Sequence, residues 1–98
     1  MSIQRWAQRR DTTEPSIVDA LTRIGVRVWR CSKPFDLLCW SGNPKRFWWV
    51  ECKTGNQPLT PDQQQFLRQF EAEEAAPIYV CRSVDEALAA AAEVGQWR

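Results

Sequence analysis

Two carboxylates and one amine in neighbouring apolar segments have the residue types and spacing of a catalytic site. Asp36 lies in the apolar run FDLLCW, Glu51 lies near the end of the run FWWVEC, and Lys53 follows it. The turn-forming residues 41–46 (SGNPKR) separate the two runs, which predicts a β-hairpin. With the turn centred on this segment, Asp36 lies directly opposite Glu51, and their Cβ atoms are roughly 4.5–5.5 Å apart. Lys53 shares their face because side chains alternate along a strand.

Two carboxylates at that separation repel each other and resist burial unless a cation lies beside them. Lys53 is one cation, but a divalent metal ion is a better match. Mg²⁺ or Mn²⁺ prefers hard oxygen ligands and stabilises the charge that develops when water attacks a phosphodiester. Lys53 would orient or deprotonate that water, or hold the scissile phosphate. A plainer alternative is an ion pair between Asp36 and Lys53 that closes the hairpin and leaves Glu51 in solvent.

The composition narrows the chemistry. The chain has no histidine, which excludes Ser-His-Asp and Cys-His nucleophilic sites. Its four cysteines form no CxxC pair, so we expect reduced, mostly buried thiols rather than a zinc site. No apolar run reaches the length of a membrane span or of a signal-peptide core, so we expect a cytoplasmic protein with no membrane partner. A length of 98 residues predicts one domain.

The net charge of +1 is unevenly distributed. Residues 1–33 hold seven Lys/Arg against three Asp/Glu, whereas residues 57–98 hold three against seven. Such polarity suits a protein that offers a basic face to nucleic acid, and residues 1–12 are expected to form a basic arm. Each basic side chain can equally be solvated surface charge. The candidate phosphate contacts are Arg5, Arg9, Arg10, Lys33, Lys45 and Arg46.

The hydrophobic pattern predicts an α/β fold with the element order α-β-β-β-α-β-α. Helices are expected over 14–24, from the N-cap Thr60 onward, and from the capping box at Ser83 to near Gly95. The strands are expected at 26–31, 35–40, 47–52 and 78–81. Because the strands are apolar on both faces, helices should flank a mixed sheet on both sides. The strand tryptophans are therefore expected in the core: Trp29, Trp40, Trp48 and Trp49.

The chemistry-bearing residues resemble a known signature. Pro34-Phe35-Asp36, a gap of 14 residues and then Glu51-Cys52-Lys53 resemble the motif of PD-(D/E)XK nucleases, with Phe35 as one extra residue. The closer likeness is to the stand-alone VRR-NUC-type nucleases of phages and prophages. In these, ExK precedes a loop and an L-[ST]-x-x-Q segment, here Leu59 to Gln63. The opening helix, with Glu14, also looks similar, and the likeness extends roughly over residues 9–90.

This resemblance implies a restriction-endonuclease-like core that binds Mg²⁺ or Mn²⁺. Asp36, Glu51 and the backbone carbonyl of Cys52 would be the metal ligands, and Glu14 would be an outer or second-metal contact. Gln63 would position water or phosphate; alternatively it is only the N3 residue of a capping box. Glu14 is alternatively only the N-cap or first-turn acid of its helix.

For function, the resemblance implies a homodimeric DNA endonuclease without a nucleotide cofactor. It would be selective for branched DNA such as Holliday junctions and, if phage-encoded, would act in the host-cell cytoplasm. A two-fold dimer would place two active sites on a two-fold-symmetric junction. The rival interpretations are a non-catalytic nucleic-acid-binding or assembly module with the same fold, and a nuclease that acts on RNA or on simple DNA ends.

Overall fold

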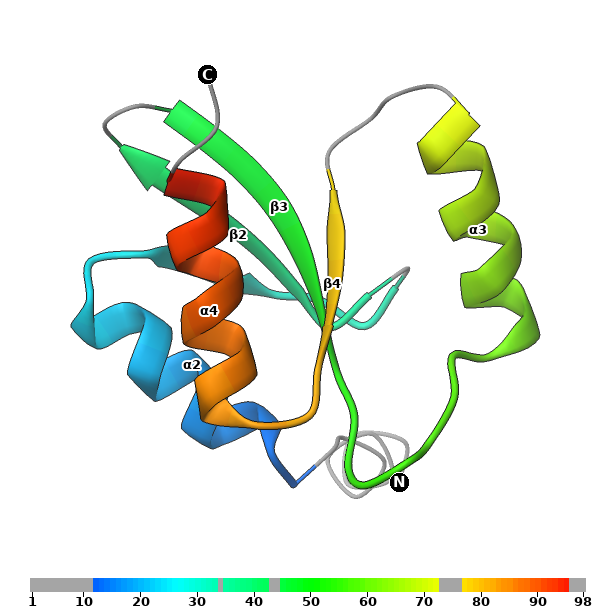
Figure 1. Cartoon of the computed structure of the whole chain (residues 1–98), viewed down its shortest axis with the longest axis horizontal. Helices are drawn as coiled ribbons and strands as arrows, with labels where there is room; N and C mark the ends of the chain where they lie inside the picture. The colour runs from blue at the N-terminus through cyan, green and yellow to red at the C-terminus, as the bar shows by residue number, and fades with distance from the viewer. Residues whose placement is uncertain (1–11, 34, 43–44, 73–76, 96–98) are drawn as a thin grey trace.

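A computed structural model describes residues 12–33, 35–42, 45–72 and 77–95. The element order is the predicted one (Figure 1). The helices are α2 (Glu14–Arg23), α3 (Pro61–Ala72) and α4 (Val84–Gly95). The strands are β1 (Arg27–Arg30), β2 (Leu37–Gly42), β3 (Lys45–Cys52) and β4 (Ile78–Cys81). Most of the expected basic arm lies outside the described residues, and the single-domain assignment stays a prediction.

The four strands form one mixed sheet in the order β1-β2-β3-β4. The first three are antiparallel, and β4 joins β3 in parallel. The predicted hairpin register is confirmed, because Leu37 pairs with Val50 and Gly42 with Lys45. The turn is shorter than expected, since the strands continue through Gly42 and from Lys45. Asp36 is one step outside β2 and therefore opposes Glu51 at the end of the hairpin.

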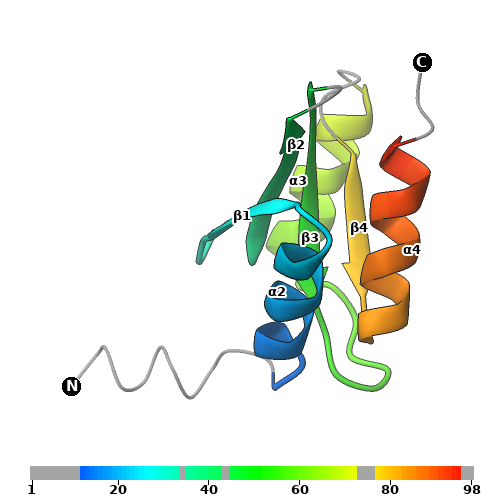
Figure 2. The same cartoon turned by 90° about the vertical axis from the view of Figure 1, so that its left-hand side faces the viewer.

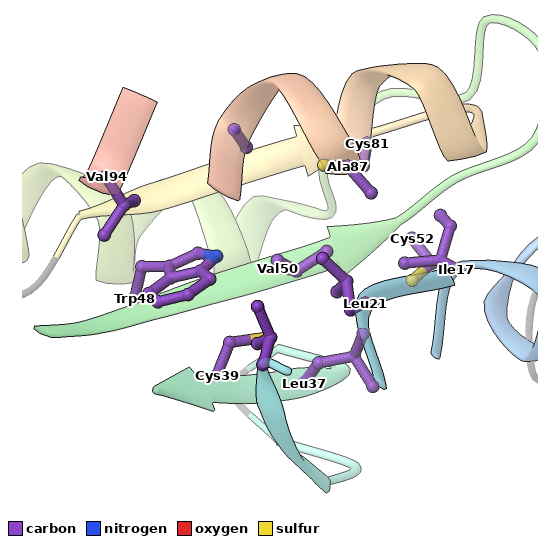
Figure 3. Close-up of a cluster of buried hydrophobic side chains, with 12 residues drawn as sticks. Ile17, Leu21, Leu37, Cys39, Trp48, Val50, Cys52, Cys81, Ala87 and Val94 are labelled. Atoms are coloured by element: carbon purple, nitrogen blue, oxygen red, sulfur yellow. The ribbon is translucent and has the colours of Figure 1, made fainter. Parts of the chain in front are cut away.

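Helices flank the sheet on both sides, as the apolar strands predict. In Figure 1, α2 and α4 lie together on one side and α3 lies on the other; in Figure 2, α2 stands in front of the sheet and α3 behind it. The main core lies between the sheet and the α2–α4 layer (Figure 3). It includes Ile17 and Leu21 of α2, and Trp48 and Val50 of β3. No helix in the described part of the chain is long and apolar enough to cross a membrane.

The second face of the sheet is packed less completely. The ring of Phe35 lies 6.1 Å from that of Trp49 and 5.8 Å from that of Phe66 in α3, measured between centroids. On the same face of the sheet, Trp29 is 65% exposed and Phe47 51% exposed. The expectation that all four strand tryptophans are in the core is therefore wrong for Trp29. Side chains alternate along the edge strand β1, so Val28 packs on the core while Trp29 points to the opposite face.

Candidate active site

Asp36 and Glu51 are interlocked by backbone hydrogen bonds where β2 begins and β3 ends. The Asp36 N–H donates to Glu51 Oε1 at 3.1 Å, and the Cys52 N–H donates to Asp36 Oδ2 at 2.9 Å. The Asp36 backbone therefore fixes the Glu51 carboxylate, and the backbone of Cys52, the residue after Glu51, fixes the Asp36 carboxylate. The position of Asp36 is set in turn by the Cys31 N–H, which donates to the Asp36 carbonyl at 2.6 Å and closes the β1–β2 connection. The hairpin thus brings the two predicted carboxylates together.

Lys53 is paired with Glu51 rather than with Asp36. Its Nζ lies 3.1 Å from Glu51 Oε2, and the two side chains are only 12% and 5% exposed. The Lys53 N–H donates to the Cys81 carbonyl at 3.1 Å, so β4 fixes its backbone. The alternative of an Asp36–Lys53 pair with a solvated Glu51 is therefore wrong.

Glu14 joins this site from the first turn of α2. It is completely buried, and its Oε2 accepts a hydrogen bond from Arg30 Nε at 2.7 Å. The Thr13 hydroxyl donates to the Lys53 carbonyl at 3.4 Å, which holds the start of α2 against the end of β3. Glu14 is therefore a first-turn acid of α2, as the plainer interpretation has it, but a buried one that is paired with Arg30. The helix N-terminus also favours its negative charge.

The adjacent carboxylates repel one another, so the site favours a bound cation. Burial, the Glu51 carboxylate and, more weakly, Glu14 raise the pKa of Asp36 to about 7, against a smaller opposing effect of the Cys52 N–H. A carboxylate oxygen of Glu14, a carboxylate oxygen of Asp36 and the Cys52 Sγ all lie within 4.8 Å of one another. Hard carboxylate oxygens suit Mg²⁺ or Mn²⁺ whereas a protonated thiol does not, so the adjacent carboxylates of Asp36 and Glu51 are the groups that fit the expected cofactor. The expected role of the Cys52 carbonyl stays a prediction.

The cysteine thiols are a poor source of nucleophiles here. Cys39, Cys52 and Cys81 are buried and Cys31 is half-buried, all without disulfides. Burial is the largest cause that raises the pKa of the Cys52 thiol, and the neighbouring carboxylates raise it further. The prediction of mostly buried thiols is confirmed.

The site opens into a pocket of about 320 Å³. The loop after Lys53 forms its outer wall, and Arg82 Nη1 pins that loop by donating to the Gly55 carbonyl at 2.8 Å. A second pocket, of about 500 Å³, is lined by residues that include Lys33 and Gln63. The first pocket is lined by Asp36, Glu51, Cys52, Lys53, Gln57, Pro58 and Thr60. Because Thr60 lines both, the two hollows are adjacent.

Gln63 forms the predicted capping box of α3. The Thr60 N–H donates to Gln63 Oε1 at 3.0 Å, and the Gln63 N–H donates to the Thr60 hydroxyl at 3.2 Å. These reciprocal bonds satisfy backbone donors at the helix start. The capping interpretation is therefore confirmed, while a catalytic role for Gln63 stays a prediction.

The structure brings only part of the predicted phosphate-binding set near the carboxylates. Lys33 is exposed and lines the second pocket. Lys45 and Arg46 begin β3 and lie at the opposite end of that strand from Glu51, about 15–20 Å away at the usual strand rise. Arg5, Arg9 and Arg10 lie outside the described residues.

Two arginines of the site were missed in the sequence. Arg30 and Arg82 each follow an apolar strand segment, and nothing in the sequence distinguished them from ordinary surface charges at strand ends. The only available signal was position: each is at the end of a strand next to the strand ends that carry Asp36, Glu51 and Lys53. Their partners lie 16 and 27 residues away, which local patterns do not reveal.

The fold and the site together define a class. A mixed sheet with an Asp opposite the Glu of an ExK triplet, flanked by helices in this order, is the arrangement of PD-(D/E)XK nucleases. Within that superfamily the chain belongs to the VRR-NUC domain family, whose model matches residues 4–85. Searches among curated proteins and among solved structures gave no significant match. Family membership makes the chain a nuclease domain and confirms the resemblance seen in the sequence.

Proposed function

We propose that this nuclease domain is an endonuclease that hydrolyses DNA phosphodiester bonds with Mg²⁺ or Mn²⁺. The observation that carries the proposal is the interlocked pair of carboxylates on the wall of an open pocket, with Asp36 Oδ2 and Glu51 Oε1 each held by a backbone N–H. Asp36, Glu51 and the Cys52 carbonyl would hold the ion. When bound, the ion would supply the positive charge that stabilises the developing charge on the phosphate.

The chain's own residues would position the reactants. Lys53 is held by Glu51 with little exposed surface, so its ammonium is fixed where it borders the pocket. It would hold a phosphate oxygen or orient the attacking water, which a flexible surface lysine does poorly. Lys33, at the adjacent hollow, would contact the DNA backbone without reading sequence.

The activity is tested with a substrate panel. Four-way junction, flap, linear duplex, single-stranded DNA and single-stranded RNA are each incubated with the full chain, with Mg²⁺, with Mn²⁺ or with EDTA. We expect cleavage only with a metal ion, and faster cleavage of the branched substrates. No cleavage of any substrate would favour the non-catalytic module, and equal cleavage of linear duplex would overturn the selectivity for structure.

We further propose that the active form is a homodimer that uses the exposed aromatic face of the sheet. On this face Trp40 stacks on Phe47, with centroids 6.2 Å apart, and Trp29 lies on the neighbouring edge strand. Monomers rarely expose large apolar patches, and dimer interfaces are enriched in aromatic residues. A second copy covering this face would pair two active sites, as a symmetric branched substrate requires.

The dimer is tested with Trp29→Lys, which places a charge at the most exposed tryptophan of this face. We expect the dimer dissociation constant, measured by sedimentation equilibrium, to rise by about 30-fold or more, as for loss of an aromatic anchor. Ile24→Lys is the matched control, because Ile24 is 56% exposed at the end of α2 and not in the sheet. A monomeric wild-type protein, or equal dimerisation of the two variants, would contradict the proposal.

A further inference from the structure

We infer that Arg30 makes this a one-metal site, because its guanidinium takes the place beside Glu14 that a second divalent ion would need. The inference rests on the proposed metal-dependent function and concerns the number of ions that the site accepts. It also assigns Arg30 as a positioning residue, which no sequence motif indicates.

The first support is the geometry of the Arg30–Glu14 pair. Arg30 Nε lies 2.7 Å from Glu14 Oε2, a short charge-assisted contact. The Glu14 side chain is fully buried, whereas that of Arg30 is 47% exposed. A guanidinium does not lose its proton in proteins, so its positive charge beside Glu14 is permanent. Glu14 is therefore already supplied with a cation in the metal-free protein.

The second support is the balance of charge in the site. Asp36 has the Glu14 carboxylate on one side and the Glu51 carboxylate bound to its own N–H on the other. Two of these three carboxylates have a basic partner: Arg30 for Glu14 and Lys53 for Glu51. Asp36 is the carboxylate for which no ion pair is found among the described residues. One divalent ion beside Asp36 and Glu51 more than balances the remaining negative charge. A second would bring two further positive charges next to a fixed guanidinium, which repels them.

The arrangement has a chemical consequence. In two-metal nucleases, the second ion helps to stabilise the charge on the attacking and leaving oxygens. Here the guanidinium supplies fixed positive charge on that side of the site, and its exposed part is available to a phosphate oxygen. Arg30 thus positions Glu14 and substitutes for an ion.

The test counts Mn²⁺ ions bound to the full chain by isothermal titration calorimetry, with electron paramagnetic resonance of free Mn²⁺ as a second readout. We expect one Mn²⁺ per chain in the wild type. In Arg30→Gln, Glu14 loses its cation, and we expect a second Mn²⁺ to bind. Arg27→Gln is the matched control, because it removes the same charge from an exposed position of the same strand and should leave the count at one.

Glu14→Gln keeps the inference testable if Arg30→Gln does not fold, because a glutamine at this buried position leaves no unpaired carboxylate. The inference requires that Glu14, with its Oε2 held by Arg30, does not ligate the ion, so the Mn²⁺ affinity of Glu14→Gln should stay within about threefold of the wild type. Two Mn²⁺ in the wild type, one in a folded Arg30→Gln, or a tenfold loss of affinity in Glu14→Gln would each overturn the inference. Two ions with active cleavage would leave the proposed function standing, whereas no Mn²⁺ binding and no cleavage would end both.

Discussion

Replacing Asp36 with asparagine should abolish cleavage and at the same time raise the stability of the metal-free protein. Asparagine keeps an oxygen that can accept the Cys52 N–H, now 2.9 Å from Asp36 Oδ2, so the strand ends stay joined. It removes the proposed metal ligand, which should lower the single-turnover rate by about 10³-fold or more. It also removes the repulsion from Glu51 that helps to raise the pKa of Asp36 to about 7.

The size of the stabilisation follows from that pKa. A rise from 3.8 to about 7 corresponds to about 4 kcal/mol at most, and we expect about 1–2 kcal/mol after solvent screening at this partly exposed position. Because the folded state binds this proton more tightly than the unfolded state, the wild-type stability should fall as the pH rises from about 4 to about 7. The Asn variant should lack this fall and have a melting temperature several degrees higher at pH 8.

Melting curves in EDTA and cleavage assays with Mg²⁺ measure the two effects separately. Asp19→Asn is the control, since Asp19 is an exposed residue of α2 that pairs with Arg23 on the helix surface. Its stability should change by less than about 0.5 kcal/mol and its cleavage should match the wild type. An Asp36→Asn protein that still cleaves, or that is less stable than the wild type at pH 8, would contradict our assignment of Asp36.

Lys53→Met should also abolish cleavage, but with the opposite effect on stability. Lys53 is the basic partner of Glu51, whose side chain is 5% exposed, so its removal leaves a buried carboxylate without its cation. Breaking such a pair costs about 3–5 kcal/mol. The cleavage rate should fall by about 10²–10⁴-fold, as for loss of a positioned proton donor or acceptor. Urea unfolding in EDTA and single-turnover kinetics measure these losses.

A second substitution separates the structural role of Lys53 from its chemical role. Adding Glu51→Gln to Lys53→Met removes the stranded charge, so most of the lost stability should return while cleavage stays absent. The same ion pair explains why Glu51→Gln alone is a less informative test than Asp36→Asn, because it leaves the Lys53 ammonium unpaired. If the urea midpoint of Lys53→Met equals that of the wild type, the ion pair between Lys53 and Glu51 does not stabilise the protein in solution, which would contradict this prediction.

The sequence by itself determined the hairpin and therefore the pairing of Asp36 with Glu51. Both depend on local features: a turn-forming segment between two apolar runs, and the alternation of side chains along a strand. The capping box of Thr60 and Gln63 was likewise readable, because its two residues are three positions apart. Local polarity predicted the ends of the two hairpin strands less well. The strand pairing extends to Gly42 in β2 and starts at Lys45 in β3, although the residues there are typical of turns.

Only the tertiary structure decided what surrounds that pair. Alternation places Trp29 and Val28 on opposite faces, but the docking of α2 and α4 determines that the Val28 face is the one packed into the core. The same docking buries Glu14 and brings it to Arg30, 16 residues away. The parallel addition of β4 fixes Lys53 through the Cys81 carbonyl. The physical reason is that burial and charge pairing depend on contacts between elements distant in the chain, which no local pattern of residues encodes.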